Sequence, residues 1–160
     1  MTEVIDLSWN GLEKEKLKVL RRLARDIIYR KRALGTGAGE WERELIREAF
    51  KILQARFPNK PASWFERAII RYFYVKEITR NTWIVYGIPE LGDLYTYYRV
   101  YLHEATGKYI CSCFNTAFGR VRRKMVCTHI AAVIIYRKVQ SILTHYLRDY
   151  TRRSSKNSYG

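Results

Sequence analysis

The chain is poor in cysteine and in long apolar runs, and each shortage excludes a class of protein. Its 160 residues include three cysteines, so a disulfide framework would leave one thiol unpaired. No apolar run approaches the ~20 residues of a membrane-spanning helix, and the longest candidate is Ile130 to Tyr136. No N-terminal stretch resembles a secretory signal. We therefore expect a cytoplasmic protein whose thiols stay reduced.

Acidic residues are also scarce, 15 against 30 basic ones, which gives a formal net charge of +15. A single domain this basic is typical of proteins that bind a polyanion. From Lys108 to Lys156 eleven basic residues face one acid, Asp149. A well-solvated surface or an acidic partner protein is the alternative explanation. Nucleic acid is the partner that the charge favours, with no membrane and no small-molecule substrate.

The patterns of nucleotide-driven enzymes are missing as well. The glycine cluster at residues 35–39 is not followed by Lys-Ser/Thr, so it is interpreted as a flexible turn and not as a phosphate-binding loop. The acids are mostly dispersed along the first half of the chain, and no carboxylates cluster beside the cysteines. We therefore expect a binding protein without catalytic residues, not an enzyme.

All three cysteines and one of the three histidines fall into two tight pairs. Cys111 and Cys113 form C-x-C, thirteen residues follow, and Cys127 and His129 form C-x-H. These donors suit one tetrahedral Zn²⁺, with Zn–S bonds of about 2.3 Å and Zn–N bonds of about 2.0–2.1 Å. Free cysteines beside an incidental histidine are the alternative, which leaves the paired spacing unexplained. Four protein ligands leave no open position, so the ion is expected to be structural.

Helical periodicity of apolar residues predicts three N-terminal helices, and the third could carry Arg67, Arg71 and Tyr72 on its solvated side. They span residues 12–34, 40–57 and 63–76. Runs rich in β-branched and aromatic residues then predict three strands, followed by a long helix after His129. The strands span residues 82–87, 95–103 and 108–110. The expected fold is therefore α+β, with a helical region (1–78), a zinc-binding domain (79–150) and a basic flexible tail (151–160).

The order of these pieces resembles the SWIM zinc finger family. In that family an apolar-aromatic strand and a second strand precede a strand ending in C-x-C, and C-x-H opens a helix. The matching segments here are residues 83–85, 98–101, 108–113 and 127–133, so the resemblance covers roughly residues 80–140. It implies that Cys111, Cys113, Cys127 and His129 bind one structural Zn²⁺. It also implies DNA binding or docking to another protein.

The segment between the two ligand pairs is strongly basic. Four cations stand just before Cys127, and two more follow in the predicted helix: Arg120, Arg122, Arg123, Lys124, Arg137 and Lys138. The metal would hold this loop against the helix, so that the charges converge on one phosphate-binding surface. Six phosphate contacts would give a log–log salt slope of roughly −5 on duplex and about −4 on single strands. An ordinary solvated loop is the alternative.

Three tyrosines, Tyr95, Tyr97 and Tyr101, alternate along the second predicted strand. They could form an aromatic face on which bases stack. Packing against a neighbouring helix is the more ordinary role of such tyrosines, so they are not assigned to the binding site.

Three functions are consistent with this sequence. The favoured one is binding of DNA in recombination, repair or other DNA transactions, which would make the protein nucleoid-associated. The second is an adaptor that docks to an ATPase of the recombinase-paralogue kind through an exposed apolar helix face. The third is an RNA-binding or ribosome-associated basic protein. The sequence leaves the strand type, the oligomeric state and the protein partner open.

Overall fold

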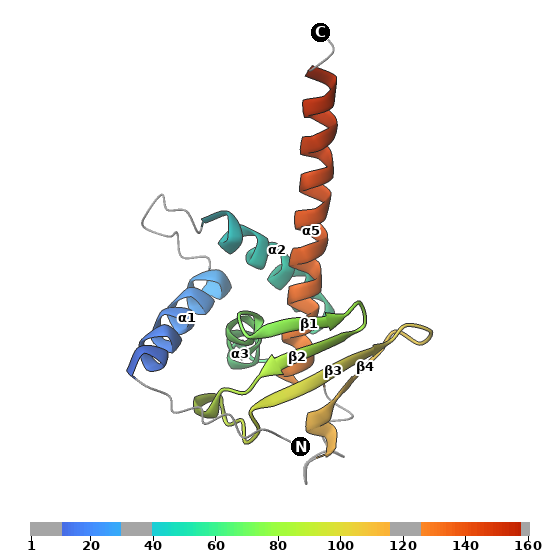
Figure 1. The fold of residues 1–160 in the computed structure, drawn as a ribbon. Helices are drawn as coiled ribbons and strands as arrows, with labels where there is room; N and C mark the ends of the chain where they lie inside the picture. The colour runs from blue at the N-terminus through green and yellow to red at the C-terminus, as the bar shows by residue number, and fades with distance from the viewer. Residues whose placement is uncertain (1–10, 30–39, 116–125, 158–160) are drawn as a thin grey trace.

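The computed structural model describes residues 11–29, 40–115 and 126–157, and it is α+β as predicted (Figure 1). Its helices are α1 (Gly11–Tyr29), α2 (Glu40–Arg56), α3 (Ala62–Tyr72) and α5 (Thr128–Asn157). Its strands are β1 (Val75–Thr79), β2 (Thr82–Tyr86), β3 (Tyr97–His103) and β4 (Lys108–Cys111). They form one antiparallel sheet in the order β1-β2-β3-β4. No helix in the described part of the chain is both long and apolar enough to cross a membrane.

The three N-terminal helices pack together through the apolar stripes that the sequence predicts. Their buried side chains form one cluster that includes Leu17, Leu20, Ala24, Ile27, Ile46, Phe50, Leu53, Trp64, Phe65 and Ile69. The ring of Phe65 meets Phe50 at 5.5 Å and Trp64 at 5.1 Å, both edge to face. Large aromatic side chains thus supply much of the buried area in a small helical layer.

The third helix is shorter than predicted, and a fourth strand replaces its expected end. Helix α3 stops at Tyr72, and Val75–Thr79 form β1, which pairs with β2 through Val75 opposite Val85. This tertiary pairing overrides the helical periodicity through residue 76. The predicted division at residues 78 and 79 falls within β1. Of the three side chains predicted to be solvated, Arg67 is exposed, but the prediction is wrong for Arg71 and Tyr72, which are only 3% and 8% exposed. Arg71 follows Ala68 by three residues and so lies on the buried stripe of the helix.

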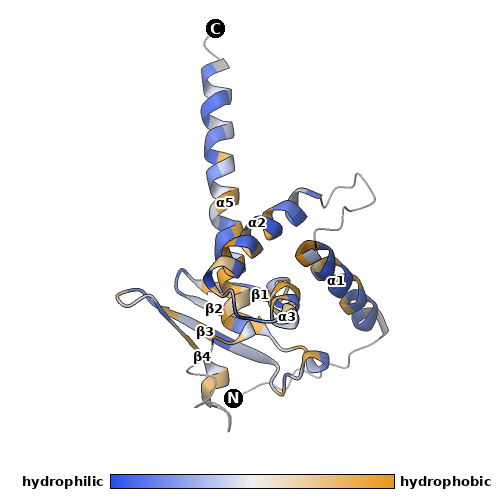
Figure 2. Cartoon of the chain, turned by 180° about the vertical axis from the view of Figure 1, so that it is seen from behind, coloured by the Kyte–Doolittle hydropathy of each residue, from blue (hydrophilic) through white to orange (hydrophobic). Residues whose placement is uncertain are grey.

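Helix α5 lies between the helical layer and the sheet and contributes to both cores. Its Ala131, Ile135 and Val139 belong to the helical cluster, whereas Ile130 and Val133 pack with the inner side chains of the sheet. Its C-terminal part stands away from the rest of the molecule and is mostly hydrophilic (Figures 1 and 2). Residues 151–157, expected in a flexible tail, continue this helix.

Candidate metal centre

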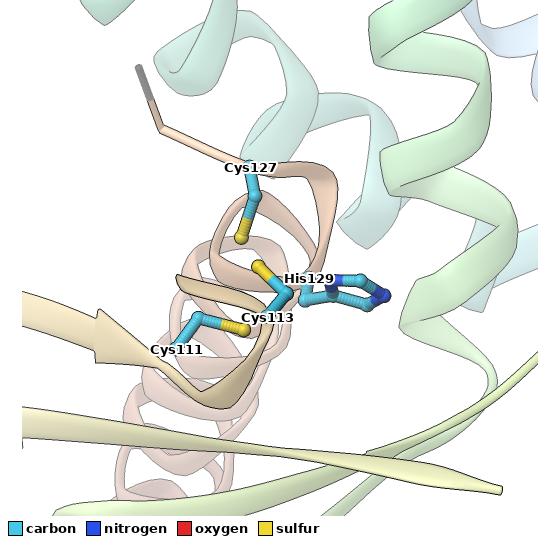
Figure 3. Close-up of side chains that lie close together, drawn as sticks. All are labelled: Cys111, Cys113, Cys127 and His129. Carbon is cyan, nitrogen blue, oxygen red and sulfur yellow. The ribbon is translucent and has the colours of Figure 1, made fainter. Parts of the chain in front are cut away.

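The two predicted ligand pairs meet in space. The potential ligand atoms of Cys111, Cys113, Cys127 and His129 all lie within 4.8 Å of one another. Figure 3 shows the three sulfurs and the imidazole ring converging. A tetrahedral site with Zn–S bonds of about 2.3 Å separates its sulfurs by roughly 3.8 Å, so small adjustments suffice. The cluster could therefore hold one metal ion, and its donor set suits zinc.

The electrostatics of the sulfurs favour a cation at their centre. None of the three cysteines forms a disulfide. Contact with the sulfurs of Cys113 and Cys127, together with burial, raises the pKa of the Cys111 thiol. Three thiolates this close would repel one another strongly in a buried site. A divalent cation removes that repulsion, and binding it requires deprotonated sulfurs.

The first ligand pair sits where the sheet ends. Strand β4 finishes at Cys111, and a 3₁₀ turn over Ser112–Asn115 carries Cys113. The Arg99 backbone N–H donates to Ser112 Oγ at 3.0 Å, which ties this turn to the neighbouring strand β3. The bend that brings Cys113 back beside Cys111 thus lies at the small polar residue between them.

The second pair opens helix α5. The Ile130 N–H donates to Cys127 Sγ at 3.5 Å, and the Ala131 N–H donates to the Cys127 carbonyl at 3.0 Å. Cys127 therefore occupies the position of a helix N-cap, where free N–H groups and the helix dipole stabilise negative charge. This placement favours the thiolate form that a metal requires.

The two ring nitrogens of His129 have different surroundings. Nε2 lies 3.1 Å from Asp93 Oδ1. Nδ1 is buried and has no hydrogen-bond partner among the described residues, and one nitrogen of the His129 ring lies within 4.8 Å of the cluster's sulfurs. An orphaned buried nitrogen is costly, but a metal ion would satisfy it. Nδ1 is therefore the ligand atom that fits, with Nε2–H donating to Asp93 as carboxylate–histidine–metal sites do.

Asp93 is fully engaged although it lies in a loop. Its carboxylate accepts hydrogen bonds from the Ile88 N–H at 2.8 Å and from both terminal nitrogens of Arg71. Burial acts to raise the pKa of Asp93, but the hydrogen bond from His129 and the charge of Arg71 outweigh it and lower the pKa to about 2. Asp93 therefore stays ionised and fixes the His129 ring.

In the loop that carries Asp93, the backbone at Gly87 lies very close to the backbone at Tyr95 and Thr96. The Gly87 N–H donates to the Thr96 carbonyl at 2.8 Å, and a Cβ at Gly87 would lie 1.9 Å from the Tyr95 carbonyl oxygen. No side chain fits there. Tyr98 supports the same loop, because its hydroxyl accepts from the Leu94 N–H at 3.1 Å. The Tyr98 ring also stacks on His129 at 4.0 Å.

The helical region holds the second ligand pair in place. From α3, Trp64 Nε1 donates to the Val126 carbonyl at 3.3 Å, and Arg71 Nε donates to Thr128 Oγ1 at 3.0 Å. Arg71 and Asp93 were not predicted from the sequence to support the site. The position of Arg71 on the apolar stripe of α3 was an available signal. Asp93 offered none, because Gly-Asp is ordinary turn composition.

Two of the six predicted nucleic-acid contacts can be located. Arg120, Arg122, Arg123 and Lys124 lie outside the described residues. Arg137 and Lys138 lie on α5 and line a groove of about 740 Å³ between this helix and the β1–β2 hairpin. Arg137 lies 5.4 Å from the Trp83 ring centroid and donates to the Tyr109 hydroxyl at 2.5 Å.

The groove is basic. Its other lining residues include Arg80, Arg148 and His145, and Glu77 is the one acid among the described residues that line it. A basic concave surface with aromatic walls suits an anionic ligand.

The chain was compared with known protein families, curated proteins and solved structures, and none of the three comparisons gives a match. The metal cluster is compatible with a zinc-finger-like unit.

Proposed function

We propose that this chain is a SWIM-type module in which one structural Zn²⁺ stabilises a nucleic-acid-binding surface. The observation that carries the proposal is the convergence of Cys111, Cys113, Cys127 and His129. When bound, zinc would cross-link the end of the sheet to the start of α5. Four protein ligands leave no position for a substrate, which supports binding and not catalysis.

Helix α5 supplies the surface that would meet phosphates. Beyond Arg137 and Lys138 it carries four more cations and one acid, Asp149; the cations are Arg148, Arg152, Arg153 and Lys156. The side chains of these four are exposed. Together with the basic segment at residues 120–124, they would form a surface whose affinity comes mainly from released counterions. DNA is favoured over RNA, with roles in recombination or repair.

The test is a salt titration of binding with zinc-loaded full-length protein, monitored by fluorescence anisotropy of labelled duplex DNA. One variant replaces Arg148, Arg152 and Arg153 by alanine. A matched control replaces Lys14, Lys18 and Arg22 of α1, which are also exposed. We expect the α5 variant to flatten the log–log salt slope by about 2–3 and the α1 variant to bind like wild type. Equal effects of the two variants would show only a general charge effect.

Exposed apolar side chains on α5 favour one second candidate, the protein-docking adaptor. The apolar stripes of α1–α3 that the sequence offered for docking are mostly buried in the core, although Trp41 on the stripe of α2 is 58% exposed. On α5, by contrast, Tyr146, Leu147 and Tyr150 are 60–74% exposed. An ATPase of the recombinase-paralogue kind is the proposed partner. A protein that binds neither DNA nor structured RNA at low salt would favour this candidate, and preference for structured RNA would favour the ribosome-associated alternative.

A further inference from the structure

The outer face of the sheet has no covering element among the described residues. The α-helices in this part of the chain lie on the other side, where α5 packs against the inner side chains (Figure 1). The strand register places three tyrosines on the outer face. Tyr86 stands directly opposite Tyr97, and Tyr101 stands opposite Ile110. Sequence considerations favoured packing against a helix for Tyr97 and Tyr101, and no described helix meets them.

The outer face combines accessible aromatic rings with positive charge. Tyr86 and Tyr101 are 38% and 37% exposed, so part of each ring is open to a ligand. Lys76, Arg99 and Lys108 point to the same side by their register. None of the three cations pairs with a carboxylate within the described ranges. We call this surface the tyrosine face and define it by Lys76, Tyr86, Tyr97, Arg99, Tyr101 and Lys108.

No outward register position of the four strands is acidic. This charge pattern argues against a second copy of the chain as the occupant, because two tyrosine faces would bring like charges together. Along β3, Tyr97 and Tyr101 are four positions apart, or about 13 Å at the usual rise of a strand. Arg99 lies midway between them. The face therefore offers separate stacking positions with a cation between.

We propose that the tyrosine face binds single-stranded nucleic acid by stacking unpaired bases on Tyr86, Tyr97 and Tyr101. Lys76, Arg99 and Lys108 contact the phosphates. The proposal rests on the proposed nucleic-acid binding and adds the strand type and the surface. Aromatic side chains stack on any base, so this binding tolerates different sequences. In a duplex the base faces are already stacked on one another, and the tyrosines find no partner.

The test uses zinc-loaded full-length protein and fluorescence anisotropy with three probes: single-stranded DNA, single-stranded RNA and duplex DNA of equal length. Tyr86→Ala and Tyr101→Ala should each weaken single-strand binding about 5- to 10-fold, the lower end for one stacked base. Duplex binding and the salt slope should not change. Tyr86→Phe and Tyr101→Phe keep the ring and should bind like wild type. Tyr29→Ala is the matched control, because Tyr29 is 60% exposed on α1.

A second measurement needs no variant and so does not depend on how the variants fold. Photocrosslinking of an iodouracil-containing single strand to wild-type protein should label peptides of β2 and β3. The inference fails, with the proposed function intact, if single strands bind but crosslink only to α5 and the alanine variants bind like wild type. Absence of any nucleic-acid binding at low salt overturns both. The DNA and RNA arms identify which single strand is preferred.

Discussion

The two faces of the four-stranded sheet differ in chemistry although they share the same strands. Along β3, Tyr98, Val100 and Leu102 are buried, whereas Arg99, Tyr101 and His103 alternate with them and are exposed. The inner face joins the core with α5 and ends at Cys111 of the metal centre. The outer face keeps aromatic and basic side chains at the surface. Because successive side chains of a strand point to opposite faces, one strand can contribute residues to the core on one face and to a binding surface on the other.

The metal centre belongs to the inner face, and its removal should have the largest effect. In Cys127→Ser one thiolate is lost, and zinc binding and folding are coupled at such sites. The apparent binding free energy of structural zinc, about 10–16 kcal/mol in zinc-finger peptides, matches the whole stability of a domain, about 5–15 kcal/mol. We expect no bound zinc by elemental analysis and no cooperative thermal unfolding of the sheet.

His145→Asn is the matched control for this variant, because His145 is exposed on α5 and lies outside the cluster. It should keep one equivalent of zinc and the wild-type melting curve. A stoichiometric zinc content in Cys127→Ser would contradict the four-ligand assignment.

The loop residue Asp93 comes next, because it supports the centre from outside the ligand set. Asp93→Asn removes the charge that balances the buried Arg71, a change that costs about 3–5 kcal/mol in comparable buried pairs. It also weakens the hold on His129, which should lower zinc affinity about 10- to 100-fold. Chemical denaturation and competition with a chromophoric chelator measure the two effects. Asp149→Asn on α5, where the carboxylate is exposed, should change neither.

A third variant tests the inner face itself. Trp83 is 1% exposed and stands opposite Val100 in the register. Trp83→Ala leaves a large cavity, and we expect the free energy of unfolding to fall by about 3–5 kcal/mol, measured by urea denaturation of the zinc-loaded protein. A loss below 1 kcal/mol would mean that the inner face does not form the core.

The smallest effect on stability is expected at the outer face of the same strand. Tyr86→Ala removes one cross-strand pair, Tyr86 opposite Tyr97 in the register, worth about 0.2–1 kcal/mol, and urea denaturation should show a loss in that range. This variant thereby separates stability from binding, because its single-strand affinity should fall while its fold persists. If Tyr86→Ala destabilises the protein as much as Trp83→Ala, the outer tyrosines are structural.

Local sequence patterns predicted most of the helices and strands, because the spacing of apolar residues reflects which side chains are buried. Helical periodicity located α1 and α2 and the start of α3, and runs rich in β-branched and aromatic residues located β2, β3 and β4. Strand β1 was missed, because its five residues take their structure from pairing with β2, which is a contact between two segments. The four ligands were found because cysteine and histidine carry metal chemistry in their residue type and spacing.

The sequence alone therefore determined the four metal ligands, the net positive charge and the alternation of side chains along the strands. These follow from composition and from the spacing of residues close together in the chain. Tertiary structure decided which residues support the site. Arg71 from α3 binds Asp93 from a loop, and Asp93 binds His129. This chain of contacts forms because α3 packs against α5 and because Gly87, with no side chain, lets the backbone of the Asp93 loop approach closely. The tertiary structure also decided that Tyr86, Tyr97 and Tyr101 face away from every described helix. Such placements follow from the packing of distant segments, and no local period encodes them.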